Sequence, residues 1–534
     1  MTPMSPGATP QAPDRRHILL MFVGLMTAML LAALDQTIFA TALPTIVGEL
    51  DGVDHMLWVT TAYILAGTIV MPIYGKVGDL IGRKPLFIIA ISLFMVGSIV
   101  GGFSQGMTEL ITGRAIQGLG GGGLMILAQA IIADVVPARE RGRYMGVMGG
   151  VFALASVAGP LLGGYFTESI GWRWCMWINI PLGAIAITSA ALFLRLERPR
   201  RAKARIDVPG MMLLAVASAS FVLASSWGGH TYAWGSWQIV GLFALALVAG
   251  VTFVRVERRA EEPIMPLYLF KQRNFVLTTS AGLLTGIAMF GTLAYMPTYL
   301  QMVAGVNATD AGLLMIPMMG SMLITSVGSG RFVTRTGRYK FLPVVGAVFL
   351  ASAMFLLSTM SWSQPVWLTC VYLAVMGIGL GLSMQIMVLI VQNTFPVSVV
   401  GTATAANNYF RQIGASLGAA VVGSLFTSRL LDLLSQRIPG GLGGAGSDVN
   451  SLTPAAVQQL PTALRDVIVS SYNDALTPVY LWMVPLALGS LVLLLFVKEK
   501  PLATRIDRDE TPESLQTDDA EREMAYVSAR RDNN

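Results

Sequence analysis

The chain has 534 residues, of which 54% are hydrophobic and only 12% are charged, with a mean hydropathy of +0.64 and a formal net charge of +6. Because average soluble domains carry roughly 25% charged residues, this composition excludes a soluble protein and indicates one that spans a membrane. The positive charge lies in short loops beside apolar runs, where anionic lipid headgroups account for it without a nucleic-acid partner.

Fourteen apolar runs are long enough to cross a bilayer as helices, and strands that alternate with a period of two are absent. We expect spans at 18–43, 56–75, 86–103, 109–135, 143–166, 175–194, 209–226, 238–254, 275–300, 311–329, 341–359, 366–391, 403–427 and 479–497. Lys and Arg gather in the loops of one side, and the loops of the other side hold only Arg173, Arg429, Arg437 and Arg465. The positive-inside rule therefore places both termini in the cytoplasm, with the chain crossing the cell inner (plasma) membrane many times.

The first span carries Asp35, the only acidic residue that we place well inside any span. An uncompensated carboxylate in hydrocarbon costs several kcal/mol, so Asp35 is expected to face the helix bundle and to be paired or protonated. Arg114 on the fourth span lies at a compatible depth when about 1.5 Å is counted per helical residue. Such a pair can exchange a proton when solvent access changes, and the alternative is a fixed ion pair that orients two helices.

The turn after the second span reads Gly-Lys-Val-Gly-Asp-Leu-Ile-Gly-Arg-Lys at 75–84, and a degenerate copy, Gly-Arg-Phe-Val-Thr-Arg-Thr-Gly-Arg-Tyr, recurs at 330–339. A basic, glycine-punctuated turn that is used twice predicts a protein of two related halves. An ordinary solvated loop is the alternative to a functional one. We expect a cytoplasmic gate formed by the turn and by nearby charges on the fourth and fifth spans: Gly75, Gly78, Asp79, Gly82, Arg83, Lys84, Asp134 and Arg143.

The spacing of the two turns sets the domain organisation. Two directly joined six-helix halves would place the copies about 190 residues apart, whereas they begin at positions 75 and 330. The surplus matches two extra spans, so the predicted fold is an all-α polytopic membrane protein of two pseudo-symmetric six-helix bundles plus an inserted helix pair. The expected parts are a tail at 1–17, a bundle at 18–194, a linker with the inserted transmembrane helices at 195–274, a bundle at 275–497 with a long outer loop at 428–478, and a tail at 498–534.

Small residues interrupt the fifth span at Gly159-Pro160 and Gly163-Gly164. They permit either a bend or close helix packing, and both interpretations stay open. Aromatic and amide groups on several spans suit a cavity for bulky amphipathic molecules, although for any one of them packing against a neighbouring helix or lipid is the better explanation. The candidate cavity residues are Gln36, Trp58, Tyr63, Gln117, Tyr295, Tyr299, Gln385, Asn407, Asn408 and Arg411.

Other chemistry finds little support in the sequence. The glycine run at 118–123 matches a dinucleotide fingerprint by letter, but no strand precedes it and it lies inside an apolar span. The three histidines, at positions 17, 55 and 230, are at span edges or in loops, which leaves no cluster for a metal or for a catalytic pair. We therefore expect no enzyme activity, no metal and no cofactor, with the proton gradient as the source of energy.

On these residues the chain resembles the major facilitator superfamily, and within it the fourteen-helix drug:proton antiporter branch. The resemblance covers roughly residues 18–500 and rests on four ordered motifs: Leu34-Asp35 to Leu43-Pro44, Gly75 to Lys84, Arg114 to Gly118, and Gly159 to Gly164.

The resemblance implies alternating access, in which proton entry drives multidrug efflux of small lipophilic or cationic compounds. It assigns Asp35 and Arg114 to proton coupling, Asp79 and Arg83 to the inner gate, and the glycines of the fifth span to a bend. The second half departs from the pattern, because Thr334 stands where the acid of the turn is expected and the thirteenth span offers an arginine without a carboxylate. A strict preference for dications is therefore not expected.

Two alternatives remain at this point. The chain can be a dedicated exporter of one lipid, siderophore or antibiotic, which substrate breadth would distinguish from a multidrug exporter. From another class, a polytopic membrane enzyme on lipid-linked substrates would need a carboxylate or histidine cluster at a membrane surface, and the sequence offers none. In either transport case we expect a monomer whose partners are protons, small substrates and membrane lipids.

Overall fold

The computed structural model describes residues 15–50, 55–194, 196, 206–229, 231–438 and 457–504. Within these ranges the regular structure is helical, apart from an isolated bridge between Gly228 and Tyr232. Fourteen helical segments are long and apolar enough to cross a membrane, which confirms the number of spans predicted from the sequence. Most of the two expected tails, and His230, lie outside the described residues.

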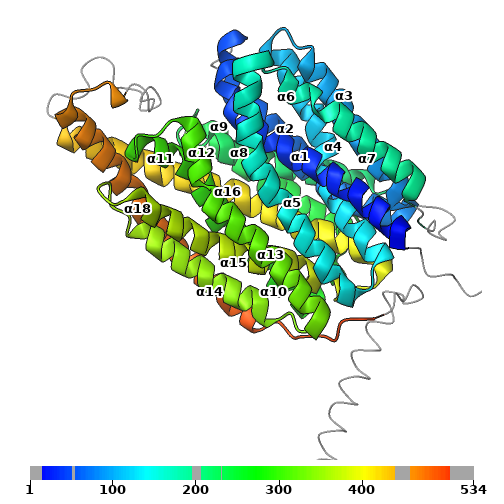
Figure 1. The fold of residues 1–534 in the computed structure, drawn as a ribbon. Coiled ribbons are helices and arrows are strands. Elements are labelled where there is room, and N and C mark those ends of the chain that lie inside the picture. Colours follow the sequence, from blue (N-terminus) through cyan, green and yellow to red (C-terminus); the bar gives the residue numbers. More distant parts are fainter. Residues whose placement is uncertain are drawn as a thin grey trace, which may run out of the picture.

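The first half of the chain forms one bundle, drawn in blue to cyan in Figure 1. A short α6 (Trp174–Trp177) leads into its sixth span, and a π-helical turn (Phe166–Ile170) ends its fifth. The bundle helices are α1 (Arg15–Glu49), α2 (Met56–Ile81), α3 (Arg83–Gly102), α4 (Met107–Val135), α5 (Ala138–Tyr165) and α7 (Asn179–Phe193).

The second half forms the other bundle, drawn in green to orange (Figure 1). Two of its spans are broken near the end that lies away from residues 75–84. There α11 (Met296–Val303) and α12 (Ala308–Leu314) meet longer helices. A proline stands in the first turn after each break, where its missing N–H costs no helical hydrogen bond. The bundle helices are α10 (Arg273–Leu293), α13 (Ile316–Thr336), α14 (Phe341–Ser358), α15 (Val366–Gln392), α16 (Val400–Arg437) and α18 (Thr462–Leu495).

The two halves repeat one packing scheme. In the first half α4 packs against α2 and α3, and α1 packs against α5 and α7; in the second half α15 packs against α13 and α14, and α10 packs against α16 and α18. By this correspondence α2 and α13 are equivalent helices, and they lead into the two copies of the glycine-rich turn. We call the end of the molecule that carries residues 75–84 the inner end.

The helix pair between the halves packs across the line where they meet. It consists of α8 (Val208–Trp227) and α9 (Trp237–Glu257), with α8 lying against both α2 and α16. Ser226 hydrogen-bonds Thr61 on α2 at 3.1 Å, and Ser218 hydrogen-bonds Tyr409 on α16 at 2.8 Å. The inserted helices therefore hold both halves on one side of the protein.

The glycine run at 118–123 has a packing role. A Cβ atom at Gly123 would lie 2.7 Å from the ring of Tyr74, and one at Gly122 would lie 2.7 Å from Cα of Gly67. Side chains at these positions would push α4 away from α2, because interiors are already close-packed. The absence of side chains thus allows the two backbones to touch, and α2 and α4 form a tightly packed pair.

The expected outer loop at 428–478 differs from the structure. Helix α16 continues to Arg437 and α18 already begins at Thr462, so helices project beyond the apolar spans. Leu430 and Leu434 are buried in one cluster with Ile468 and Tyr472, which gives the extensions a core of their own. The apolar runs at 403–427 and 479–497 are therefore shorter than the helices that contain them, because amphipathic packing continues a helix beyond its apolar stretch. Residues 439–456 lie outside the described ranges.

Candidate functional site

Asp35 lies on α1 in the interior of the first half, with no exposed surface. Its carboxylate accepts hydrogen bonds from Arg114 Nη1 at 2.5 Å, from Gln117 Nε2 at 3.1 Å and from Asn179 Nδ2 at 2.9 Å. The Ser98 hydroxyl accepts from the same two amides, at 2.7 Å from Gln117 and 3.1 Å from Asn179. The structure thus brings Asp35 and Arg114 into contact inside a closed polar cluster built by α1, α3, α4 and α7.

The guanidinium of Arg114 is enclosed on every side. Its carbon atom lies 4.2 Å from the centroid of the Phe39 ring and 4.4 Å from that of Tyr63, both of which are favourable cation–π distances. Nε donates to the Val59 carbonyl at 3.4 Å, and Nη1 also donates to Gln117 Oε1 at 2.8 Å. With Asp35 ionised the cluster is electrically balanced; protonation would leave a buried guanidinium without its counter-charge.

Two members of this cluster were not predicted as site residues. Asn179 is a neutral amide at the start of α7, and Ser98 is a small polar residue in an apolar helix, of a kind that usually bonds its own backbone. A neutral polar residue in a span is weak evidence for a functional site, because packing explains each one equally well. A charged pair at matched depth is a stronger signal, since the cost of leaving either charge alone is large.

A second cluster joins the two halves at the inner end, and we call it the inner latch: Asp79, Arg83 and Asp134 with Gly401 and Thr402. The Asp79 carboxylate accepts from the backbone N–H of Gly401 at 3.2 Å and from that of Thr402 at 2.7 Å, and it also accepts from the Thr402 hydroxyl at 2.8 Å. Arg83 pairs with Asp79 at 2.6 Å and with Asp134.

The two backbone donors belong to the first turn of α16, where a helix has free N–H groups and a partial positive charge. Asp79 on α2 therefore caps a helix of the opposite half.

Glycines make this approach possible. A Cβ atom at Gly75 would lie 2.8 Å from the Gly401 carbonyl oxygen and would overlap the side chain of Ala405. Gly82 has a φ of 101°, a conformation that favours glycine, and it separates α2 from α3 so that Arg83 turns back toward Asp79. Gly75 and Gly82 thus serve the latch through backbone geometry.

The remaining gate candidates are placed differently. Gly78 packs against Leu127, and the Lys84 ammonium donates to the Ala191 carbonyl at 2.8 Å, so both contacts stay within the first half. The side chain of Arg143 is exposed, and its backbone N–H donates to the Thr334 hydroxyl of α13 at 3.2 Å. The threonine that replaces the acid of the second turn therefore still joins the halves.

The glycines of the fifth span pack against α1. Gly159 faces Thr37 and Gly163 faces Thr41, in each case with the threonine hydroxyl where a Cβ atom would be. The Thr37 hydroxyl donates to the Ala155 carbonyl at 2.9 Å, which ties α1 to α5 just before Pro160. Close packing thus accounts for Gly159 and Gly163, whereas Gly164 has open space around it.

The ten cavity candidates lie in several parts of the described structure. Tyr63 and Gln117 belong to the Asp35 cluster, Trp58 contacts Trp227 of the inserted pair, and Gln36 is exposed beside buried Asp35. The hydroxyl of Tyr299 donates to Asn473 at 2.8 Å, and that of Tyr295 donates to the Ala419 carbonyl at 3.4 Å, so both lie within the second half. Four candidates lie on α15 and α16 near the contact between the halves: Gln385, Asn407, Asn408 and Arg411.

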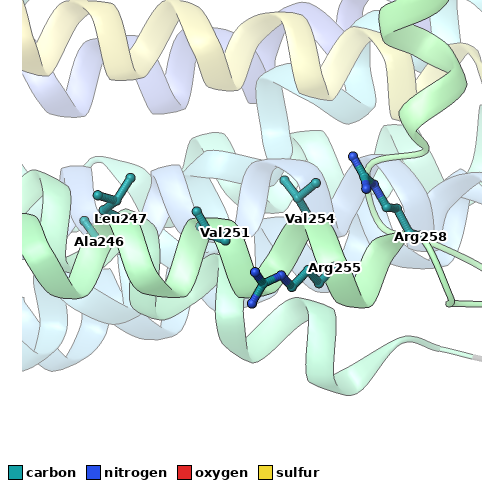
Figure 2. Close-up of a pocket in the computed structure, with 7 residues that line it drawn as sticks. Ala246, Leu247, Val251, Val254, Arg255 and Arg258 are labelled. Carbon is teal, nitrogen blue, oxygen red and sulfur yellow. The ribbon is translucent and has the colours of Figure 1, made fainter.

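A groove of about 410 Å³ runs along α9, and none of the residues that line it belongs to these clusters. Figure 2 shows Leu247, Val251 and Val254 along it, with Arg255 and Arg258 at its inner end. An apolar face that ends in arginines is typical of a helix side in contact with lipid chains and headgroups. Within the described ranges, no group of three or more His, Cys, Asp or Glu side chains is placed to hold a metal ion.

Comparison with known proteins agrees with this architecture. A family model described as Major Facilitator Superfamily matches residues 25–419. An uncharacterized MFS-type transporter of Mycobacterium tuberculosis is 43% identical over 494 residues, which cover 92% of this chain and 71% of that protein. The multidrug transporter protein MdtP of Bacillus subtilis is 36% identical over 516 residues, covering 92% of this chain and 95% of its own.

Solved structures agree on the fold. The crystal structure of the human organic anion transporter MFSD10 (TETRAN) matches with a TM-score of 0.58, over 91% of this chain and 100% of that chain. Sequence identity is 15%, so the match concerns the fold alone.

Proposed function

Because this chain belongs to the major facilitator superfamily and is a membrane transporter of the efflux type, we propose that it exports diverse hydrophobic compounds in exchange for protons, by alternating access of its two halves. The observation that carries the proposal is Asp35, a fully buried carboxylate on α1 that holds α4 and α7 through Arg114, Gln117 and Asn179. A carboxylate in that position is a group whose protonation changes the contacts among three helices.

The coupling follows from charge. Removing one partner of a buried ion pair costs about 3–5 kcal/mol, so Asp35 takes up a proton only together with a rearrangement that gives Arg114 another acceptor or access to water. A proton that crosses a potential of about 100 mV releases about 2.3 kcal/mol, and a pH difference adds to this. These magnitudes are comparable, which is the condition for a gradient to drive the rearrangement.

The inner latch is the proposed gate on the cytoplasmic side. In this structure it is closed, with Asp79 bonded to the first turn of α16. Because α2 and α4 pack backbone to backbone, a shift of α4 at Arg114 is transmitted to Asp79 on α2. We propose that protonation of Asp35 loosens α1 from α4 and biases the latch toward opening.

Gradient-driven transport of a fluorescent hydrophobic dye into inverted membrane vesicles tests the coupling. Asp35→Asn is expected to abolish uptake that depends on an imposed pH gradient while preserving dye exchange without a gradient, because binding and rocking remain. Glu49→Gln is a matched control, since Glu49 is an exposed carboxylate on the same helix. Equal gradient-dependent uptake by Asp35→Asn and the unaltered chain would contradict the proposal.

Export requires that the inner end lie on the cytoplasmic side of the plasma membrane. The excess of Lys and Arg in the loops of that end supports this orientation. Labelling of Glu140→Cys at the inner end by a membrane-impermeant maleimide tests it: labelling in inverted vesicles and not in intact cells is expected. Labelling in intact cells alone would reverse the orientation.

A further inference from the structure

Arg411 is an arginine on a membrane-spanning helix for which the described part of the chain shows no acidic partner. Arg411 lies on α16, partly buried, and its guanidinium donates from Nη2 to Asn408 Oδ1 at 2.5 Å. Among the described residues, no carboxylate forms an ion pair with it. Charged side chains in spans are expensive and are normally paired or placed on a substrate path. Arg411 therefore adds a positive charge that no described acidic group compensates.

The surroundings of Arg411 have unused hydrogen-bonding capacity. Asn408 Nδ2 donates to Gln129 Oε1 on α4 at 3.0 Å, and Gln392 Nε2 on α15 donates to the Gln129 carbonyl at 3.2 Å, so this amide cluster joins the two halves. Gln129 and Gln392 are at most 1% exposed, yet within the described part of the chain Gln129 Nε2 and Gln392 Oε1 have no partner. Buried polar atoms are normally satisfied, so the cluster can accommodate further polar groups.

Position and charge favour one class of ligand. At 1.5 Å per residue along α16, Arg411 is about 14 Å from Thr402 in the inner latch, which is near the middle of a span of about 30 Å. The acidic groups that could otherwise bind an organic cation are already paired, Asp35 with Arg114 and Asp79 with Arg83. An organic cation at this depth would be repelled by Arg411, whereas an anion would gain both a charge partner and N–H donors.

We propose that Arg411 binds the carboxylate of an amphiphilic substrate, with Asn408 and Gln129 as neighbouring polar groups and the apolar part of the substrate between the halves. This inference rests on the proposed export function and narrows its cargo to compounds with an anionic oxygen group. The planar guanidinium presents two parallel N–H groups that match a carboxylate, and the bound substrate supplies the missing counter-charge. The proposal thus favours anionic cargo, whereas the family resemblance implies lipophilic or cationic compounds, and the binding experiment decides between the two.

Binding to the purified full-length protein in detergent, without any gradient, tests the inference. The probes are a dansyl-labelled undecanoic acid, its methyl ester, and the trimethylammonium compound with the same fluorophore and chain length. The unaltered protein is expected to bind the acid at least about tenfold more tightly than the other two, and Arg411→Gln is expected to remove that preference by weakening the acid roughly 10- to 100-fold. Arg411→Lys keeps the positive charge but lacks the two parallel N–H groups of the guanidinium. Its affinity for the acid is expected to lie between those of the unaltered protein and Arg411→Gln.

Arg429→Gln is the matched control, because Arg429 is an exposed arginine on the same helix beyond the expected span. Equal affinity for the three probes in the unaltered protein, or an equal loss for all three in Arg411→Gln, would overturn the inference and leave a packing role. If Arg411→Gln does not fold, the affinities of the three probes for the unaltered protein decide whether the inference holds. Since no gradient is used, a failure of proton coupling at Asp35 leaves this result unaffected, and the reverse also holds.

Discussion

The contact between α2 and α16 predicts that a single methyl group at Gly75 will open the inner end. A Cβ atom there would lie 2.8 Å from the Gly401 carbonyl, at least about 0.6 Å short of the 3.4 Å at which ordinary contact begins, and it would also overlap Ala405. Both neighbours belong to α16, so α2 and α16 can accept the methyl group only by separating. Gly75→Ala is therefore expected to destabilise the closed inner latch.

The size of the effect follows from packing. Adding a methylene-sized group to a close-packed contact costs about 1–3 kcal/mol. The gain in helix propensity from Gly to Ala, about 1 kcal/mol, is the same in both conformations of the transporter and cancels from their ratio. The equilibrium should therefore shift toward the open inner end by about 5- to 150-fold. Transport should fall, because each cycle must pass through the closed state.

Distances between spin labels at the inner end measure this shift. Labels at Ile81→Cys on α2 and Arg273→Cys on α10, both exposed positions in different halves, report the separation of α2 from the α10–α16 pair in a background with Cys175 and Cys370 replaced by serine. Gly328→Ala is the matched control, since a Cβ at this helical glycine would meet nothing within 4 Å. An unchanged distance distribution in Gly75→Ala would refute the reasoning that this glycine sets the closed contact.

Three further predictions concern groups around the same seam. Asp79→Asn removes the charged cap of α16 and should shift the same distance distribution toward the open state by about 2 kcal/mol, with unchanged distances as the contrary result. Lys76 and Glu262 form an ion pair at 2.7 Å, and a double-mutant cycle of Lys76→Gln and Glu262→Gln should give a coupling energy of about 0.5–1 kcal/mol in detergent unfolding; additive losses would mean that the pair is not coupled. Tyr409→Phe breaks the hydrogen bond to Ser218 and should lower unfolding free energy by about 1 kcal/mol, whereas no loss would show that water replaces Ser218.

The sequence allowed the fold and the charged pair to be predicted, because both follow from the cost of polar groups in lipid. Apolar run lengths yielded fourteen spans, and the repeated turn predicted two related halves. Asp35 and Arg114 could be matched by depth alone, since a lone charge in a span needs a partner. These inferences require only distance along a helix, which 1.5 Å per residue supplies.

Contacts between the halves could not be predicted in this way. Asp79 and Thr402 are 323 residues apart, and nothing in either segment encodes which helix of the other half will approach it. Neutral residues posed the same difficulty: Tyr299 and Gln117 looked alike as cavity candidates, but one bonds Asn473 within the second half and the other bonds Asp35. Depth along a helix was predictable, whereas the direction in which a side chain points depends on packing that only the structure provides.

The two lines of contact between the halves differ in a way that determines how they can move. Helices α5 and α13 approach closely at the inner end, where a Cβ at Gly142 would lie 3.0 Å from the Gly330 carbonyl. The contact continues to the other end of α5, where Pro160 lies 3.5 Å from the Cβ position of Gly312 on α12. By contrast, the hydrogen bonds recorded between α2 and α16 are confined to the latch. A packed contact along the whole length can act as an axis, and hydrogen bonds confined to one end can act as a latch.

In the proposed alternating access, rotation about α5 and α13 would separate α2 from α16, and α8 lies against both of these helices. It bonds α2 through Ser226 and α16 through Ser218, so it cannot follow both halves when they part. One of the two attachments would then have to break or slide in every cycle. The inserted helix pair therefore adds an energetic cost to opening that two directly joined six-helix halves would not carry, and the strength of its weaker attachment sets the size of that cost.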